Sequence, residues 1–352
     1  MKKLPARLLC LVSTLLLTTA CAKPAALFSS AGATPGIAYI TIKGVEYSTA
    51  LTELTITFSK LTNDDIIPLQ YMTSLTHLDL SSNQINDITP LAKLTSLTKL
   101  YLQSNPVTDF IPLAKLTSLS WLDLSMCKIY DLTPVAGLTS LCTLNISYTP
   151  INDLTPLAGL TDLVALDLSL IPAEDITTLT KLTNLTKLHV SSSQASDLTP
   201  VSGLTSLTDL SLYDCQINDL SLIAGLTNLT HINLNSNQIK DLTPLANLTK
   251  LQSLALSFNH INDLTQLTGL TELTSLNLRK NLISDLSPLA GLVNLTYLSL
   301  DNNHINDVTP LAGLPNLKDV YLQDNPITDL SPIGHIPHVV VEPPPVAPCG
   351  VN

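Results

Sequence analysis

Apolar residues recur along this chain with a fixed period of 22 residues. Leucine occupies position 75 and every twenty-second position after it up to Leu317, twelve times without a slip. The further apolar columns of the unit 75–96 begin at Leu78, Leu80, Ile85, Ile88, Leu91 and Leu94. A period this strict indicates one structural unit stacked on itself, in which each copy covers the apolar face of its neighbour.

The first part of each unit has the pattern of a β-strand. Leu78 and Leu80 alternate with the polar residues His77 and Asp79, which is the period of a strand with one buried face. We expect successive strands to pair in parallel in one long curved sheet. The columns that begin at His77, Asp79 and Ser81 should then be open to solvent.

The second part of each unit predicts a short helical turn. Thr89-Pro90 offers a hydroxyl at the cap and a proline at the first helical position, where a missing N–H does no harm. Because 22 residues leave no room for a long helix, we expect 3₁₀ or single-turn segments on the convex side. The predicted fold class is an α/β solenoid with a concave parallel sheet.

Two polar columns accompany the apolar ones. Aspartate stands at position 87 and at each equivalent position up to Asp329. A carboxylate two residues before a turn can accept backbone N–H groups that the bend leaves unpaired, so we expect a structural role. A buried amide in the other column could satisfy the backbone where the chain leaves the strand. That column contains Asn83, Asn105, Asn237, Asn259, Asn281, Asn303 and Asn325.

Five consecutive repeats interrupt the asparagine column. They carry Cys127, Thr149, Ile171, Ser193 and Cys215 in its place, and two of them have alanine (Ala173, Ala195) where isoleucine is usual. An isoleucine cannot form hydrogen bonds, and an alanine fills less of the core. The sequence therefore predicts that the middle of the array is its least regular part and the first to open.

The N-terminus is similar to a bacterial export signal. Lys2, Lys3 and Arg7 form a charged start, and residues 8–17 are an apolar core too short for the roughly 20 residues of a membrane-spanning helix. Thr18-Thr19-Ala20-Cys21 resembles a lipoprotein box. We interpret residues 1–20 as a lipoprotein-type signal peptide with a lipid on Cys21. Cleavage after Ala22, which would give a secreted protein, is the alternative.

The rest of the chain divides around the repeats. We predict a linker over 21–35, an N-terminal β-type cap over 36–52, and a degenerate first repeat over 53–74. Twelve repeats follow over 75–338, and residues 339–352 form a C-terminal strand remnant and a proline-rich tail. The apolar positions that the first repeat keeps are Ile56, Phe58, Ile66 and Leu69.

The acidic charge of the chain limits which partners it can bind. The formal net charge is −11, whereas nucleic acids and anionic lipid surfaces both require a basic patch, so neither is expected as a partner. Membrane contact is expected only through a lipid on Cys21.

Cys127 and Cys215 share a column four repeats apart, about 19 Å at sheet spacing, which exceeds disulfide reach. We therefore expect isolated thiols. We also expect a monomer that needs no cofactor.

The repeat LxxLxxLxLxxNxIxDIxPLxxLxx resembles the leucine-rich repeats of bacterial internalins over roughly 50–340, in its length and its Asn, Asp and Pro columns. The resemblance implies a right-handed solenoid whose concave sheet binds other proteins. The β-type cap and the tail VVVEPPPVAPCGVN depart from internalins that enter host cells, which carry a helical cap, an immunoglobulin-like domain and a wall anchor. A surface-tethered recognition protein is the expectation, and a host-receptor adhesin is an alternative.

The solvent-facing columns of the strands and their exits begin at His77, Asp79, Ser81, Ser82 and Gln84, and they hold seven of the fourteen aromatic residues. Rigid Tyr and Trp side chains are the usual anchors of protein interfaces, although exposed positions can also acquire rings by drift. We expect one patch around Tyr101, Trp121, Met126 and Tyr148, and a second group near the C-terminal end. The candidate concave-face residues are Lys99, Tyr101, Trp121, Asp123, Met126, Tyr148, Tyr213, Phe258, Tyr297 and Tyr321.

An enzyme is not expected. His189, Asp167 and Ser191 can be drawn as a hydrolytic triad on adjacent strands, and His189, Asp209 and His231 as metal ligands. Catalysis needs a dry pocket with supporting groups, which an open, serine-rich sheet does not offer. We therefore predict a scaffold that binds a protein, or a glycan, on its concave face, without metal or catalytic residues. A structural cell-envelope protein without a dedicated ligand is the competing class.

Overall fold

The repeats form one parallel sheet, which confirms the predicted solenoid. The computed structural model describes residues 38–192, 194–195 and 197–341. Fourteen strands in these residues pair in chain order, and from β4 to β15 each residue pairs with the one 22 positions later, as Leu78 does with Leu100. The strands are β3 (Glu53–Thr55), β4 (His77–Asp79), β5 (Lys99–Tyr101), β6 (Trp121–Asp123), β7 (Thr143–Asn145), β8 (Ala165–Asp167), β9 (Lys187–His189), β10 (Asp209–Ser211), β11 (His231–Asn233), β12 (Ser253–Ala255), β13 (Ser275–Asn277), β14 (Tyr297–Ser299), β15 (Asp319–Tyr321) and β16 (His338–Val340).

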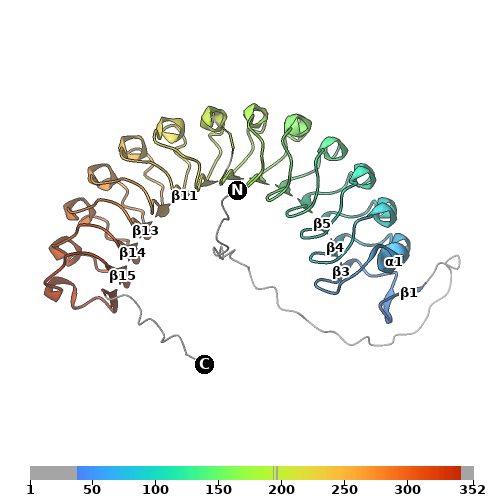
Figure 1. Ribbon diagram of the computed structural model, residues 1–352, viewed down its shortest axis with the longest axis horizontal. Helices are drawn as coiled ribbons and strands as arrows, with labels where there is room; N and C mark the ends of the chain where they lie inside the picture. The colour runs from blue at the N-terminus through green and yellow to red at the C-terminus, as the bar shows by residue number, and fades with distance from the viewer. Residues whose placement is uncertain (1–37, 193, 196, 342–352) are drawn as a thin grey trace, which may run out of the picture. The chain divides into compact units, whose positions relative to one another are not determined.

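A short 3₁₀ turn follows each strand from β3 to β15, as the repeat length requires. The strands line the inner side of the repeat array and the turns line its outer side (Figure 1). The turns are η1 (Ile67–Tyr71), η2 (Thr89–Lys93), η3 (Ile111–Lys115), η4 (Thr133–Val135), η5 (Thr155–Gly159), η6 (Thr177–Lys181), η7 (Thr199–Gly203), η8 (Ser221–Ile223), η9 (Thr243–Leu245), η10 (Thr265–Leu267), η11 (Ser287–Leu289), η12 (Thr309–Leu311) and η13 (Ser331–Ile333). We refer to the strand side as the concave face.

A separate β-hairpin precedes the sheet. Strands β1 (Tyr39–Ile42) and β2 (Val45–Ser48) pair antiparallel across Lys43-Gly44, both of which have positive φ, as a two-residue hairpin turn requires. Ile40 and Ile42 are buried. One turn of α-helix, α1 (Asn63–Ile66), then leads from β3 into η1. The predicted signal peptide, Cys21, the linker and the proline-rich tail lie outside the described residues.

The aliphatic columns form one continuous core. Leu75 and Leu78 are fully buried, and the same holds for nearly every equivalent leucine along the array. Burial of such a side chain contributes roughly 1.5–3 kcal/mol, and conformational entropy offsets most of the total. No helix in the described part of the chain has the length and apolar content needed to cross a lipid bilayer.

Two details of the expected repeat are wrong. Phe58 is not a core residue: it is 81% exposed at φ 52, and fully buried Leu61 fills the core instead. Two extra residues between β3 and β4 shift the first repeat out of step with the others, because Leu54 pairs with Leu78 across 24 positions. The Thr89 hydroxyl also does not cap η2, for Thr89 is the first residue of that turn.

The aspartate column supplies the cap in place of threonine. The backbone N–H of Thr89 donates to Asp87 Oδ1 at 2.8 Å, and the equivalent bond is present in all twelve repeats, as far as Ser331 N to Asp329 Oδ1 at 2.8 Å. Hydrogen bonds from the Thr89 hydroxyl and backbone N–H lower the pKa of the Asp87 carboxyl, because they favour its charged form. The structural role predicted for this column is confirmed.

The asparagine column forms the predicted buried ladder. Asn259 Nδ2 donates to Leu256 O and, in the preceding repeat, to Leu234 O, both at 3.0 Å. Its Oδ1 accepts from Ile239 N at 3.0 Å. Each buried amide therefore ties its own turn to the previous repeat, which satisfies backbone groups that the chain reversal would otherwise leave unpaired.

Thiols take over part of this task in the interrupted stretch. Cys127 Sγ donates to Leu102 O at 3.3 Å and Cys215 Sγ to Val190 O at 3.3 Å, the carbonyls that an asparagine would reach in the preceding repeat. Burial raises the pKa of the Cys127 thiol to about 12, so it stays protonated and able to donate. Cys127 and Cys142 carry free thiols. Strand pairing runs unbroken from β6 to β10.

Candidate functional site

Outward-facing side chains form rows across the concave face. Lys99 pairs with Trp121 and Tyr101 with Asp123, because neighbouring strands are in 22-residue register. Adjacent strands lie about 4.8 Å apart, so residues that occupy the same position in successive repeats are neighbours on the surface. The position of each candidate residue along the face therefore follows from its repeat. Only candidates in adjacent repeats are close enough to form one contact surface.

An aromatic pair lies near the N-terminal end of the face. The ring centroids of Tyr101 on β5 and Trp121 on β6 are 6.0 Å apart, with the planes tilted by 41°. Trp121 is 38% exposed and Tyr101 is half-buried. Burial, together with the nearby carboxylates of Asp79 and Asp123, raises the pKa of the Tyr101 hydroxyl. Lys99 is half-buried beside Trp121 in the strand register.

Met126 and Tyr148 do not lie on the strands. They occupy the turns that follow β6 and β7, where every repeat has a residue with positive φ. Leu170 holds the same place after β8, and the three side chains are 55%, 50% and 41% exposed. We call Met126, Tyr148 and Leu170 the apolar ridge. The expected single patch thus consists of two parts, a ring pair on the strands and a ridge on the turns.

The ridge residues are unusual for their backbone conformation. A left-handed residue other than glycine costs about 1–2 kcal/mol, and Asn or Asp tolerate it best. Most other repeats have a small or polar residue here, such as Ser82, Asp214 or Asn302, whereas the ridge, like Phe258, has large apolar side chains. The patch expected from the sequence did not include Leu170. Its place 22 positions after Tyr148 was the signal that could have identified it.

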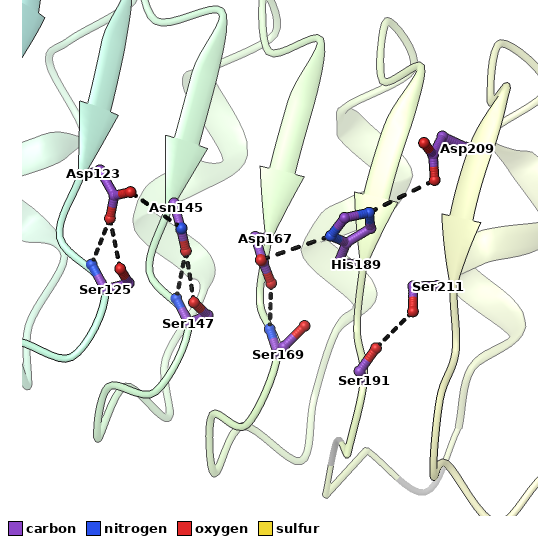
Figure 2. Close-up of polar contacts among 10 residues, drawn as sticks. All are labelled: Asp123, Ser125, Asn145, Ser147, Asp167, Ser169, His189, Ser191, Asp209 and Ser211. Atoms are coloured by element: carbon purple, nitrogen blue, oxygen red, sulfur yellow. Dashed lines mark hydrogen bonds and ion pairs between the residues drawn. The ribbon is translucent and has the colours of Figure 1, made fainter. Parts of the chain in front are cut away.

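A row of polar side chains continues from the ring pair toward the centre of the face (Figure 2). Asn145 Nδ2 on β7 donates to Asp123 Oδ2 at 3.3 Å. Further along, His189 on β9 stands between two carboxylates, with Nδ1 3.7 Å from Asp167 Oδ2 and Nε2 3.6 Å from Asp209 Oδ1. These contacts join β6 to β7 and, separately, β8 to β9 and β9 to β10 through side chains.

The carboxylates set the protonation of this row. Hydrogen bonds that His189 donates to Asp167 and Asp209 raise its pKa to about 9, against an opposing effect of burial. The interaction with His189 lowers the pKa of Asp209. At Asp167 burial raises the pKa, but hydrogen bonds from His189 and Ser169 together outweigh it, so the pKa is also lowered. Asp123 has no such cation, and burial raises its pKa. Near neutral pH, His189 is therefore a cation that donates from both nitrogens.

The structure does not form the hydrolytic triad or the metal site that the sequence allowed around His189. The Ser191 hydroxyl pairs with the Ser211 hydroxyl at 2.8 Å rather than with His189. An imidazolium with both N–H groups directed at carboxylates has no lone pair with which to accept a serine proton. In the described residues, no group of three or more His, Cys, Asp or Glu side chains is arranged to hold a metal ion.

A second aromatic pair lies near the C-terminal end. Tyr297 on β14 and Tyr321 on β15 have centroids 5.6 Å apart, tilted by 45°. Phe258, 43% exposed in the turn after β12, lies under two cations, with Lys280 Nζ 4.7 Å and Arg279 Cζ 5.8 Å from its ring centroid. Tyr213, half-buried after β10, stands four repeats from either pair. The candidate residues therefore fall into separate groups.

The two pairs share a local frame. Tyr101-Leu-Gln103 and Tyr321-Leu-Gln323 occupy equivalent positions ten repeats apart, and no other repeat combines these residues. In both, the glutamine Oε1 is buried without a hydrogen-bond partner, and no other described side-chain nitrogen or oxygen is in that state. The surroundings differ, since the apolar ridge begins in the same repeat as Trp121, whereas polar groups surround the second pair.

Comparisons with known proteins agree with this architecture. A family model described as "Leucine Rich repeats (2 copies)" matches residues 73–115, 205–247 and 293–335, and one described as "Leucine rich repeat" matches 249–305. No curated protein sequence matches the chain. A Leptospira interrogans leucine-rich-repeat protein shares the fold at 24% identity and a TM-score of 0.65, over 76% of this chain and 77% of its own.

Two further solved structures are similar to this chain. The ectodomain of an Arabidopsis thaliana membrane receptor kinase has the same fold at 22% identity and a TM-score of 0.63, over 78% of this chain and 36% of its own. An internalin, inlF, from Listeria monocytogenes is 35% identical with a TM-score of 0.77, over 85% of this chain and 89% of its own. With the 22-residue repeat and its Asn and Asp columns, this shows that the chain belongs to the internalin-like leucine-rich-repeat family.

Proposed function

We propose that this protein is a surface-tethered scaffold that binds another protein on its concave face. The observation that carries the proposal is the exposure of large apolar side chains where folding gains nothing from them. Trp121 is solvent-exposed beside Tyr101, and the apolar ridge keeps three bulky residues in a backbone conformation that disfavours them. Exposed rings held in fixed positions are the usual anchors of protein interfaces.

The frame around these residues supports the same function. Each anchor is fixed on a strand or turn that both neighbouring repeats hold, so little conformational entropy remains to be lost on binding. The row from Asp123 to Asp209 supplies hydrogen-bonding groups and charges beside the apolar anchors, as in the polar rim of an interface. An acidic chain should favour a partner with a neutral or basic contact surface.

The binding test compares anchors with an exposed ring elsewhere. Trp121→Ala and Tyr148→Ala should each weaken capture of partner proteins from envelope or host-cell extracts, by about 2 kcal/mol, or roughly thirtyfold. Tyr130→Ala is the matched control, because Tyr130 is 64% exposed on the loop before η4. The melting temperature should change little in all three variants. Equal capture by all of them would favour a structural envelope protein without a ligand on this surface.

We also propose that the protein is exported and held at the cell surface by a lipid on Cys21. The support is the charged start, the apolar core and the cysteine of the N-terminal segment. Accumulation of an unprocessed form in cells treated with globomycin, which inhibits lipoprotein signal peptidase, is the expected result. Processing that continues after Cys21→Ala would indicate cleavage after Ala22 and a secreted protein.

A further inference from the structure

A hollow of about 520 Å³ opens on the concave face between β13 and β15. That volume lies in the range of small-molecule sites. The nine residues that line it come from three successive repeats, and all are polar or aromatic. Because sites for apolar ligands and apolar interface anchors are lined mainly by hydrophobic side chains, this hollow suits a different kind of ligand.

Two aromatic rings form the apolar part of the lining. Tyr297 and Tyr321 are both half-buried, with centroids 5.6 Å apart. They lie on adjacent paired strands, so their positions are set by the sheet. A ring offers an apolar face of fixed shape, and its hydroxyl adds a polar group at the edge. Because their planes are tilted by 45°, they make a rigid, partly exposed aromatic corner, in which one ring face can contact a weakly polar ligand surface.

The polar part of the lining is held in place by its own hydrogen bonds. Asp301 is only 8% exposed, accepts from the Ser299 hydroxyl at 2.9 Å and accepts from Gln323 N at 3.2 Å. On the rim, Asn302 Nδ2 donates to Asp324 Oδ2 at 3.0 Å. Each carboxylate oxygen retains acceptor capacity beyond these bonds. The hollow thus presents both donors and acceptors in fixed geometry.

One polar atom in the lining of the hollow has no hydrogen-bond partner. The Oε1 atom of Gln323 is buried without a donor, although buried polar atoms are nearly always paired. Rotation of the terminal amide, which has a soft torsion, turns either of its polar ends toward the hollow. A ligand that carries hydroxyl groups can then donate to the oxygen or accept from the nitrogen.

We propose that this hollow binds one ring of a neutral oligosaccharide, as a site separate from the protein-binding surface around Trp121. A sugar ring has an apolar C–H face that fits against tyrosine and a rim of hydroxyls that both donate and accept. The charges favour a neutral ligand: Asp301 and Asp324 oppose an anion, while the Arg279 guanidinium in the same lining opposes a cation. The mixed lining suits hydroxyls, which need both types of partner.

The test uses an array of immobilised oligosaccharides, with neutral hexose and N-acetylhexosamine chains and uronic-acid chains as the anionic comparison. The whole protein should retain neutral chains in preference to anionic ones. A retained chain, titrated in solution by calorimetry, should bind at least about tenfold more weakly to Tyr297→Ala and Tyr321→Ala. Tyr321→Phe should keep most of the affinity, because it keeps the ring.

Matched controls separate this site from the other surface. Trp121→Ala and Tyr213→Ala remove exposed or half-exposed rings of the same face outside the hollow and should leave saccharide binding unchanged. Unaltered melting of each tyrosine variant excludes misfolding as the cause of a loss. If no immobilised chain is retained, or if the Tyr297 and Tyr321 variants bind as the wild type does, the proposal is overturned. Binding of an oligolysine peptide alone, lost in Asp324→Asn, would reassign the hollow to a cationic segment.

Discussion

His189 shows how one side chain can hold several strands together on an open face. Its two nitrogens lie within ion-pair distance of Asp167 and Asp209, on the strands before and after it. A side chain with two donors suits this place because both neighbours carry acceptors. In the sequence the same residue could be drawn as the base of a hydrolytic triad, an interpretation that was not favoured, and in the structure it is a cation between two carboxylates.

This arrangement predicts a pH-dependent contribution to stability. The pKa of His189 is raised from 6.5 to about 9 in the folded protein, so its ion pairs contribute fully below pH 6.5 and are lost as pH rises through 9. The lowered pKa values of Asp167 and Asp209 mean that the contribution also fades as pH falls below 3.8. Because His189 is partly exposed, solvent screening limits the effect to about 1 kcal/mol.

The measurement is chemical unfolding of the wild type and His189→Gln across pH. The variant should be less stable at pH values between the aspartate and histidine limits, and the difference should shrink as the pH approaches 10. His260→Gln, an exposed histidine in a turn, serves as the control and should show little difference. A difference that does not vary with pH, or an NMR titration of His189 near 6.5, would contradict the assignment.

A repeat that keeps both polar columns is closed by two polar side chains at fixed places. The aspartate accepts the first N–H of the 3₁₀ turn, and the asparagine links the end of the strand to the repeat before it. The two differ in burial, since Asp241 is exposed and Asn259 is 6% exposed. The asparagine should therefore matter more for stability, because water cannot replace its bonds.

Asn259→Ala tests this difference. The substitution leaves Leu234 O, Leu256 O and Ile239 N without the bonds that Asn259 supplies, so the free energy of unfolding should fall by about 3 kcal/mol. Asn184→Ala is the control: Asn184 is exposed and makes one bond, to Thr161 O at 3.0 Å, and its loss should cost about 0.5 kcal/mol. Similar losses in the two variants would mean that the ladder is not a special source of stability.

Along the array, stability should follow the quality of these repeat-to-repeat bonds. Solenoid repeats contact mainly their neighbours, so a weak interface is not rescued by distant ones. The stretch from Cys127 to Cys215 keeps its strand pairing but replaces the amides with two thiols, two hydroxyls and an isoleucine. Thiols are weak donors and poor acceptors, so each such interface is weaker than one with asparagine.

Hydrogen exchange should reveal this weakness directly. We expect the strand amides of β6 to β10 to exchange faster than those of β11 to β14, because local opening begins where the interfaces are weakest. Ile171→Asn, which returns the amide to the least satisfied of these repeats, should slow exchange on β8 relative to the wild type. Uniform protection across all the strands would contradict the prediction.

Much of the fold and part of the site could be predicted before any coordinates. The strands, the turns and the two polar columns follow from local patterns that repeat in step, so each copy reinforces the interpretation. Phe58 was misplaced because the first repeat has two extra residues, and periodicity gives no warning of a local shift. Met126 and Tyr148 were expected in one patch with the rings, but the structure divides that patch between the strands, which carry the rings, and the turns that follow them.

The sequence by itself determined that the chain stacks in 22-residue steps, because burial of the aliphatic columns requires that register. It also determined which side chains face outward, since a strand alternates its faces. Only the tertiary structure decided which of them meet: Tyr101 with Trp121, Tyr297 with Tyr321, and His189 with two aspartates rather than with Ser191. Those contacts depend on rotamers and on competition among neighbours in adjacent repeats, which a one-dimensional pattern does not contain.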